Sequence, residues 1–211
     1  IDSDNLDYSI VGGLNISSEM NGSIITFTSL SDFNGSEEFT ASVTDGEYTS
    51  DQTFTVTVSG VNDAPVFDTI SSIVFNEDTS YTLTLSANDI DGDDLIYSIT
   101  GGTEITAILS GSDVTFSAPL DFNGSEFFTA SVTDGILQDV STFEVSVSPV
   151  NDSPLAADGS ATTSEDQSVV ITISGSDVDG DVLTYSLGAQ AEFGTVVIEG
   201  AFATYTPNDN F

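Results

Sequence analysis

The sequence predicts an all-β chain of tandem Greek-key β-sandwich modules with about seven strands each, and three observations lead to this fold class. Short segments alternate apolar and polar residues with a period of two, as strands with one buried face do. Asn-Gly and Asp-Gly pairs separate these segments, as in β-hairpins. The whole pattern recurs with a period of about 89 residues, which indicates internal repeats.

The predicted strands carry inward-facing apolar residues at alternate positions, with mostly Ser and Thr between them on the outward face. No segment shows the 3.6-residue apolar period of an amphipathic helix. A module of this kind resembles a sandwich of the immunoglobulin type. The inward rows are, in chain order, Phe39, Ala41 and Val43; Phe54, Val56 and Val58; Tyr81, Leu83 and Leu85; Phe128, Ala130 and Val132; Phe143, Val145 and Val147; and Val169, Ile171 and Ile173.

One 15-residue stretch is repeated almost without change. Residues 32–46 read DFNGSEEFTASVTDG and residues 121–135 read DFNGSEFFTASVTDG, which sets the offset of 89. The acidic segment DIDGD at 89–93 likewise recurs as DVDGD at 177–181. A period near 90 residues is an ordinary size for a small domain.

These landmarks divide the chain into three copies of one module. We predict a first copy at residues 1–60 that lacks its N-terminal strands, a complete copy at 61–149, and a third copy at 150–211 that is truncated in its C-terminal half. The simplest interpretation is a window cut from a longer array. The alternative is a subunit that completes the broken modules of other copies by strand donation.

The composition excludes many functions. The chain has 35 Asp plus Glu and no Lys, Arg, His or Cys, so its formal net charge is −35, although 38% of its residues are hydrophobic. Without His or Cys there is no Ser-His or Cys-His nucleophile and no ordinary zinc site. Without Lys or Arg there is no phosphate clamp, and we expect no nucleic-acid partner. Carboxylates, hydroxyls, amides and carbonyls remain, which are ligands of hard cations.

We expect neither enzymatic activity nor insertion into a membrane for this segment. Paired carboxylates can serve a glycosidase, but here they repeat from module to module without any Trp to form a sugar platform. No apolar run approaches the roughly 18 residues that a membrane-spanning helix needs.

Acidic motifs recur at fixed places relative to the predicted strands. They are Asn-Asp-x-Pro between modules, Asp-x-Asp-Gly-Asp after the second strand, and Asp-Phe-Asn before the last hairpin, with Glu77 and Glu165 as a further pair. Carboxylates about 5 Å apart repel by about 3 kcal/mol at an effective dielectric of 20. No Lys or Arg relieves this repulsion, so the motifs favour a divalent cation, and flexible mixed oxygen ligands suit calcium better than magnesium. Turn chemistry alone is the alternative, above all at the Asp-Gly hairpins of Asp45 and Asp134.

At this point the sequence resembles the cadherin-like repeats of large bacterial and archaeal surface proteins. FTVTVSGVNDAPVF at residues 54–67 is similar to the end of one cadherin repeat running into the next. ANDIDG at 87–92, followed by LIYSI at 95–99, is similar to the family's Asp-x-Asp calcium motif and its next strand. TDG at 133–135 is similar to a turn late in the family's module. The resemblance covers essentially the whole chain.

The resemblance implies calcium (Ca2+) at the junctions between modules. It assigns to the first junction Asp32, Asn62, Asp63, Asp89, Asp91 and Asp134, and to the second Glu77, Asp121, Asn151, Asp152, Asp177 and Asp179. Two departures from the family predict fewer or weaker ions. The linker is one residue shorter and lacks its first Asp, and the family's Asp-Arg-Glu is replaced by Asp-Phe-Asn.

From these observations we expect a calcium-rigidified structural segment of an extracellular adhesin stalk or cell-surface filament. The expected partners are neighbouring repeats of the same chain, and also other copies of itself or a glycan. The alternatives are an adhesive module that binds a glycan or another copy of itself, and a fibre subunit that assembles by strand donation. The near identity of residues 32–46 and 121–135 favours a spacer over a ligand-binding patch.

Overall fold

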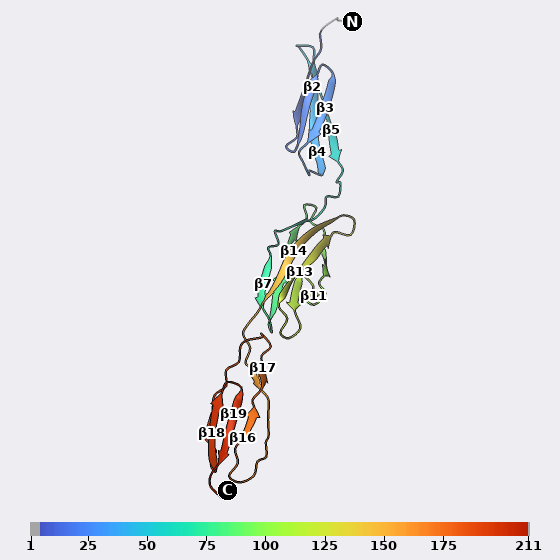
Figure 1. The fold of residues 1–211 in the computed structure, drawn as a ribbon. Helices are drawn as coiled ribbons and strands as arrows, with labels where there is room; N and C mark the ends of the chain where they lie inside the picture. The colour runs from blue at the N-terminus through green and yellow to red at the C-terminus, as the bar shows by residue number, and fades with distance from the viewer. Residues whose placement is uncertain (1–4, 211) are drawn as a thin grey trace.

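The structure is a computed structural model that describes residues 5–210, and in this range it consists of strands and loops. Figure 1 shows three groups of strands that follow one another along an elongated molecule. We refer to β1–β5 as unit 1, β6–β14 as unit 2 and β15–β19 as unit 3. The all-β prediction is confirmed, whereas the count of seven strands, the exact period and the three module boundaries stay predictions.

Unit 1 contains one three-stranded sheet and one hairpin. The sheet has the order β1-β4-β5, and the hairpin pairs β2 with β3. Phe27 contacts Phe39 and Phe54 with ring centroids 4.9 and 5.9 Å apart, so the hairpin packs over the sheet. The strands are β1 (Asp7–Gly12), β2 (Ile16–Asn21), β3 (Ile24–Ser29), β4 (Gly35–Thr44) and β5 (Thr49–Val58).

Unit 2 forms a β-sandwich. One sheet has the order β10-β13-β14-β7, a second has the order β11-β12-β8, and the short strands β6 and β9 pair with each other. All pairings are antiparallel except that of β14 with β7. The strands are β6 (Val66–Phe67), β7 (Ile73–Asn76), β8 (Ser80–Thr84), β9 (Ala87–Asn88), β10 (Ile96–Gly101), β11 (Thr106–Ser110), β12 (Asp113–Ser117), β13 (Gly124–Thr133) and β14 (Gln138–Ser148).

The core of unit 2 lies between its two larger sheets. Phe116 of β12 contacts Phe128 of β13 and Phe143 of β14, with ring centroids 5.1 and 6.1 Å apart. These three rings stand 89 positions after the cluster in unit 1, so both units use one core plan. The inward rows predicted for β13 and β14 are buried throughout, as alternation in a half-buried strand requires.

Unit 3 has one three-stranded sheet, of order β16-β19-β18, and the short pair β15-β17. Its predicted inward row Val169, Ile171 and Ile173 is partly buried. The strands are β15 (Leu155–Ala156), β16 (Val169–Thr172), β17 (Gly175–Ser176), β18 (Gly194–Glu199) and β19 (Phe202–Pro207).

Partly buried carboxylates fix two loops of the sandwiches. Glu37 of unit 1 accepts backbone hydrogen bonds from Leu14, Asn15 and Ile16, each of 2.9 Å. Glu126, its counterpart in unit 2, accepts three backbone hydrogen bonds from residues 103–105. These hydrogen bonds hold residues 14–16 against β4 and residues 103–105 against β13.

Candidate metal centres at the two junctions

The second junction, between units 2 and 3, is built around Glu77. This residue directly follows β7, whose parallel pairing with β14 brings it to the start of the linker. Its side chain is 3% exposed, and its backbone N–H donates to the Ser148 carbonyl at 3.0 Å. Its Oε1 accepts a 2.6 Å hydrogen bond from the Val150 N–H, whereas its Oε2 is buried without a hydrogen-bond partner.

The linker and unit 3 add two carboxylates to Glu77. Asp152 lies in the linker, and its backbone N–H donates to Asp179 Oδ2 at 2.7 Å. Asp179 in turn lies in the loop after β17, and its N–H donates to Asp177 Oδ1 at 3.0 Å. Glu77, Asp152 and Asp179 each offer one oxygen within 4.8 Å of the other two, and Asp152 Oδ2 is buried without a hydrogen-bond partner.

A second group of carboxylates shares Asp152. Asp78, Asp121 and Asp152 also place one oxygen each within 4.8 Å of one another. The Asp121 N–H donates to Asp78 Oδ1 at 3.3 Å, and both residues have left-handed backbone, with φ of 58° and 61°. Asp tolerates this conformation better than most residues, which suits a tight turn that presents a carboxylate. The two groups together can hold more than one cation.

The second junction is electrostatically strained without a cation. Burial raises the pKa of Asp152 above its ordinary value, and the negative charges of Asp121 and Asp179 raise it further. Each effect disfavours the ionised carboxylate. A bound cation would reverse both effects.

The first junction, between units 1 and 2, gathers its carboxylates within one loop. Asp89, Asp91 and Asp93 follow β9, and each places one oxygen within 4.8 Å of the other two. The Asp63 N–H of the linker donates to Asp91 Oδ2 at 2.8 Å, which matches the linker bond at the second junction. Asp89 Oδ2 is buried without a hydrogen-bond partner. Burial raises the pKa of Asp93, and the charges of Asp89 and Asp91 raise it further.

The Asp-Gly hairpin of unit 2 also reaches the first linker. Asn62 Nδ2 donates to Asp134 Oδ2 at 2.8 Å, while Asp134 Oδ1 accepts from the N–H groups of Ile136 and Leu137. These hydrogen bonds, that of Asn62 first, lower the pKa of Asp134. The contact ties the β13–β14 hairpin to the linker.

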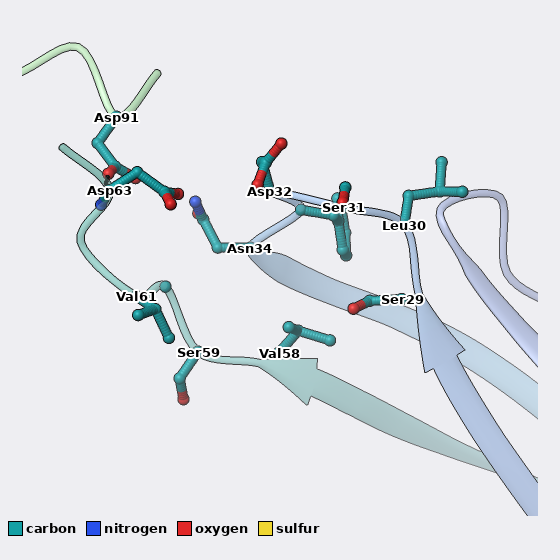
Figure 2. A pocket seen from close by; sticks show the side chains of 12 residues that line it. Ser29, Leu30, Ser31, Asp32, Asn34, Val58, Ser59, Val61, Asp63 and Asp91 are labelled. Atoms are coloured by element: carbon teal, nitrogen blue, oxygen red, sulfur yellow. Dashed lines mark hydrogen bonds between the residues drawn. The ribbon is translucent and has the colours of Figure 1, made fainter. Parts of the chain in front are cut away.

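Unit 1 faces this loop across a pocket. Figure 2 shows Asp32 and Asn34, on the loop before β4, facing Asp63 and Asp91 on the other side. Asp32 has the same left-handed backbone as Asp121, with φ of 59°. It lines the pocket but is not a member of the carboxylate groups found among the described residues.

The structure thus brings together many, but not all, of the residues that the sequence singles out. Glu77, Asp121, Asp152 and Asp179 converge at the second junction, and Asp89 and Asp91 converge at the first. Asn151 instead directs its Nδ2 to the carbonyl of Asp152, at 2.9 Å, and Asp177 accepts backbone N–H groups of the following loop. The assignment of these residues as ligands stays a prediction.

Sequence reasoning missed Asp78 and Asp93, which belong to the carboxylate groups, and Asn34, which lines the pocket. All three had a signal in the repeat. Asp78 recurs as Asp166, Asp93 recurs as Asp181, and Asn34 recurs as Asn123. Recurrence at the module period could therefore have added them.

The fold and the junctions define a class of protein, namely a tandem array of cadherin-like, immunoglobulin-like β-sandwich units with acidic junctions. Residues 62–148 and 151–211 match the model of the bacterial Ig domain, and the chain belongs to this family. No helix within residues 5–210 is long and apolar enough to cross a membrane.

Known proteins share the fold or part of the sequence. Repeats EC1-3 of mouse protocadherin-24 cover 96% of this chain and 76% of that chain, with 20% identity and a TM-score of 0.56. Chitinase A of Pseudoalteromonas piscicida is 31% identical over 152 residues, which is 70% of this chain but 18% of the chitinase. An endo-fucoidan hydrolase of glycoside hydrolase family 107 matches 97% of this chain with a TM-score of 0.36 and 16% identity, and the match spans 34% of that hydrolase.

Proposed function

We propose that this chain is a structural segment of an extracellular adhesin stalk or cell-surface filament, made rigid by calcium between its β-sandwich units. The observation that carries the proposal is a pair of buried oxygens at the second junction. Glu77 Oε2 and Asp152 Oδ2 are buried without hydrogen-bond partners, and both residues belong to one convergent carboxylate group. A buried charge without a partner is costly, so a cation here would satisfy both oxygens.

The donor set suits calcium. The junctions offer carboxylates, amides and carbonyls on loops, and the chain has no Cys or His for softer metals. It has no Lys or Arg either, so a cation from solution is the available partner for these carboxylates. Calcium accepts six to eight oxygens in flexible geometry, whereas magnesium requires a strict octahedron.

Each junction has its own ligand set in this proposal. The second uses carboxylates of both units and of the linker, and the first uses mainly one loop. The proposed ligands are Glu77, Asp78, Asp121, Asp152 and Asp179 at the second junction, with Asn151 and Asp177 beside them, and Asp89, Asp91 and Asp93 at the first, with Asp32, Asn62, Asp63 and Asp134 beside them.

Calcium would stiffen the chain by joining segments that otherwise meet only through a short linker. An ion at the second junction would bind the end of β7, the linker and the loop after β17 at once. Because each unit contacts only its neighbours, the length of such an array depends on the number of repeats. This role fits the extracellular location that we propose, since extracellular modules often bind calcium with Kd of about 10⁻⁴ to 10⁻³ M.

The test compares the whole chain in millimolar calcium, in magnesium and in EGTA. We expect calcium to raise the melting temperature and to increase the radius of gyration measured by small-angle X-ray scattering, because the units stop hinging. Magnesium should have a much smaller effect. An unchanged melting temperature together with an unchanged radius of gyration would contradict the proposal.

A role in glycan binding is the second candidate, favoured by the similarity to a protein named chitinase. Because the chain spans 18% of that protein, it would act as a non-catalytic accessory segment. Incubation of the chain with insoluble chitin, with cellulose as the control polymer, tests this role. Equal recovery in the supernatant with both polymers would exclude chitin as the ligand.

A further inference from the structure

Units 1 and 2 differ systematically on one surface. At four equivalent positions of this surface, 89 residues apart, unit 1 carries an exposed acid and unit 2 an exposed large apolar residue; a fifth such pair, Glu19 and Ile108, lies on the other sheet. Within the repeated 15-residue stretch, the change from Glu38 to Phe127 is the only difference. The pairs are Asp7 and Ile96, Glu38 and Phe127, Glu47 and Ile136, and Asp51 and Val140; the apolar members are 64%, 67%, 77% and 55% exposed.

Three of these apolar residues lie on the outer face of β10, β13 and β14. On β13 the alternate residues Phe128, Ala130 and Val132 are buried, so Phe127 points outward. Ile96 pairs with Thr133, and Val140 pairs with Ser131, which places them on the same outward face. Ile136 lies in the turn between β13 and β14.

Hydroxyl groups fill the space between the apolar residues. Thr129 and Thr142 pair across the strands with their Oγ1 atoms 3.1 Å apart, and Ser98 pairs with Ser131. The face of unit 2 carries one outward acid on these strands, Glu144, which pairs with Phe127. It is therefore a nearly uncharged face on a chain of net charge −35.

We propose that this face of unit 2, which we call the β13 face, docks against the β13 face of a second copy of the chain around a two-fold axis. The inference goes beyond the stalk role and does not depend on the calcium sites. A two-fold contact uses the same surface on both copies, so that surface must complement itself. The layout of the β13 face meets this requirement.

Self-complementarity follows from the register. Phe127 lies four residues along β13 from Ser131, about 13 Å at 3.3 Å per residue. A two-fold axis that crosses the strands near Thr129 therefore sets Phe127 of each copy over Ser131 of the other, beside Val140 and diagonally next to Ile96. The hydroxyl rows meet at the centre, where they can exchange hydrogen bonds.

Charge favours this face of unit 2 over the equivalent face of unit 1 as the contact between copies. Every charged side chain of the chain is acidic, so two copies can form no ion pair with each other. The equivalent face of unit 1 would bring six carboxylates together, from Asp7, Glu38 and Asp51 of each copy. The β13 face brings only two carboxylates into the contact, Glu144 of each copy, so the repulsion is much smaller.

The contact is small. Three strands at about 4.8 Å spacing and about 25 Å of length cover about 400 Å² on each copy. This is about half of the ~800 Å² per partner of a standard stable interface. We therefore expect a weak dimer, which neighbouring chains on one surface would multiply through avidity.

Sedimentation equilibrium of the whole chain at up to about 1 mM, in 0.5 M NaCl to screen repulsion, tests the proposal. The triple variant I96D/F127E/V140D installs the residues that unit 1 already tolerates. We expect a dimer of the unaltered chain, and a dissociation constant at least tenfold higher for the variant, with an unchanged circular dichroism spectrum. A monomeric unaltered chain, or a variant that dimerises equally well, would overturn the proposal.

Cross-linking provides a second measurement with a matched control. The chain has no Cys, so T129C and its unit 1 counterpart T40C each introduce a single thiol. Packed sheets lie about 10 Å apart, and a bis-maleimide of that span should join two T129C chains near the axis but not two T40C chains. Equal yields from the two variants would count against the β13 face.

Discussion

The two junctions share their motifs but differ in where the carboxylates come from. At the second junction, Glu77 and Asp78 of unit 2 lie close to Asp152 of the linker, and Asp179 of unit 3 joins them. At the first, the convergent group belongs to one loop of unit 2.

This difference separates two roles that a junction cation can have. The linker bond is the same in both places, since Asp63 N–H donates to Asp91 at 2.8 Å and Asp152 N–H donates to Asp179 at 2.7 Å. Only at the second junction do carboxylates of both flanking units converge within the described residues. A cation at the second junction would therefore connect units, whereas the carboxylates that converge at the first junction lie in one loop of unit 2.

The largest expected effect comes from Glu77→Gln. The amide keeps an acceptor for the Val150 N–H but removes a buried charge, so the metal-free chain should gain about 1–3 kcal/mol of stability in unit 2. Calcium binding at the second junction should weaken at least tenfold, and the calcium-dependent rise in melting temperature should shrink. Calorimetric melts with calcium and with EGTA measure both changes. A variant that is less stable without calcium and keeps the full rise would contradict the assignment.

The second largest effect is expected from the double variant D89N/D91N, the matched change at the first junction. We expect this variant to lose calcium from the first junction, because two of its three convergent carboxylates become amides. The stiffness between units 2 and 3 should remain, since the group around Glu77 is intact. Equilibrium dialysis gives the stoichiometry, and scattering gives the radius of gyration. Loss of stiffness equal to that of Glu77→Gln would show that the junctions do not differ in role.

The sequence could predict the strands but only part of the junctions. Rows such as Phe128, Ala130 and Val132 alternate strictly, and alternation alone determines which face is buried. The recurrence of the acidic motifs predicted that they matter together. The burial of Glu77 could not be predicted, because it depends on the parallel pairing of β7 with β14, residues about 70 positions apart.

Asp78 and Asp93 show the same limit. Each stands in a turn-forming segment where Asp is favoured for local reasons, so its type alone does not separate a ligand from a turn residue. The role of Glu126 was also hidden, since its backbone partners at 103–105 are linked to it only by the fold.

An intermediate effect is expected from pH in the metal-free chain. The raised pKa of Asp152 means that the folded chain binds a proton at a pH where the unfolded chain, with its pKa near 3.8, has lost it. The stability of the second junction should therefore rise as the pH falls through the folded pKa of Asp152 toward 3.8. Asp93 should act in the same sense at the first junction, where its pKa is raised as well.

Thermal melts of the chain after metal has been removed by dialysis, recorded over a series of pH values below 7, measure this gain, and D152N should abolish most of it. Further acidification should lower the stability of the folded chain. The lowered pKa of Glu37, caused first by the Asn15 N–H, gives stability above pH 4.5 that is lost as the pH falls through the folded pKa. A metal-free chain whose stability falls steadily from pH 7 would contradict the repulsion inferred at Asp152.

The smallest expected effect comes from Asn34→Asp. Asn34 packs over Gly60, with its amide toward Asp63 across the pocket of Figure 2. A carboxylate at this exposed position should strengthen calcium binding at the first junction by a few-fold, about 0.5–1 kcal/mol. It would also give unit 1 a second acidic residue at that junction, beside Asp32, and so move the first junction toward the two-sided arrangement of the second.

Isothermal titration with calcium measures the gain, and N123D, at the equivalent position of unit 2, is the matched variant. If too few carboxylates of unit 1 reach the first junction, N34D should increase both the calcium affinity and the calcium-dependent stiffness. N123D should change the stiffness little, because unit 2 already supplies Glu77, Asp78 and Asp121 to the second junction. Equal increases in stiffness for the two variants would show that the origin of the carboxylates does not distinguish the junctions, and the contrast between a connecting cation and a loop-ordering cation would then have to be given up.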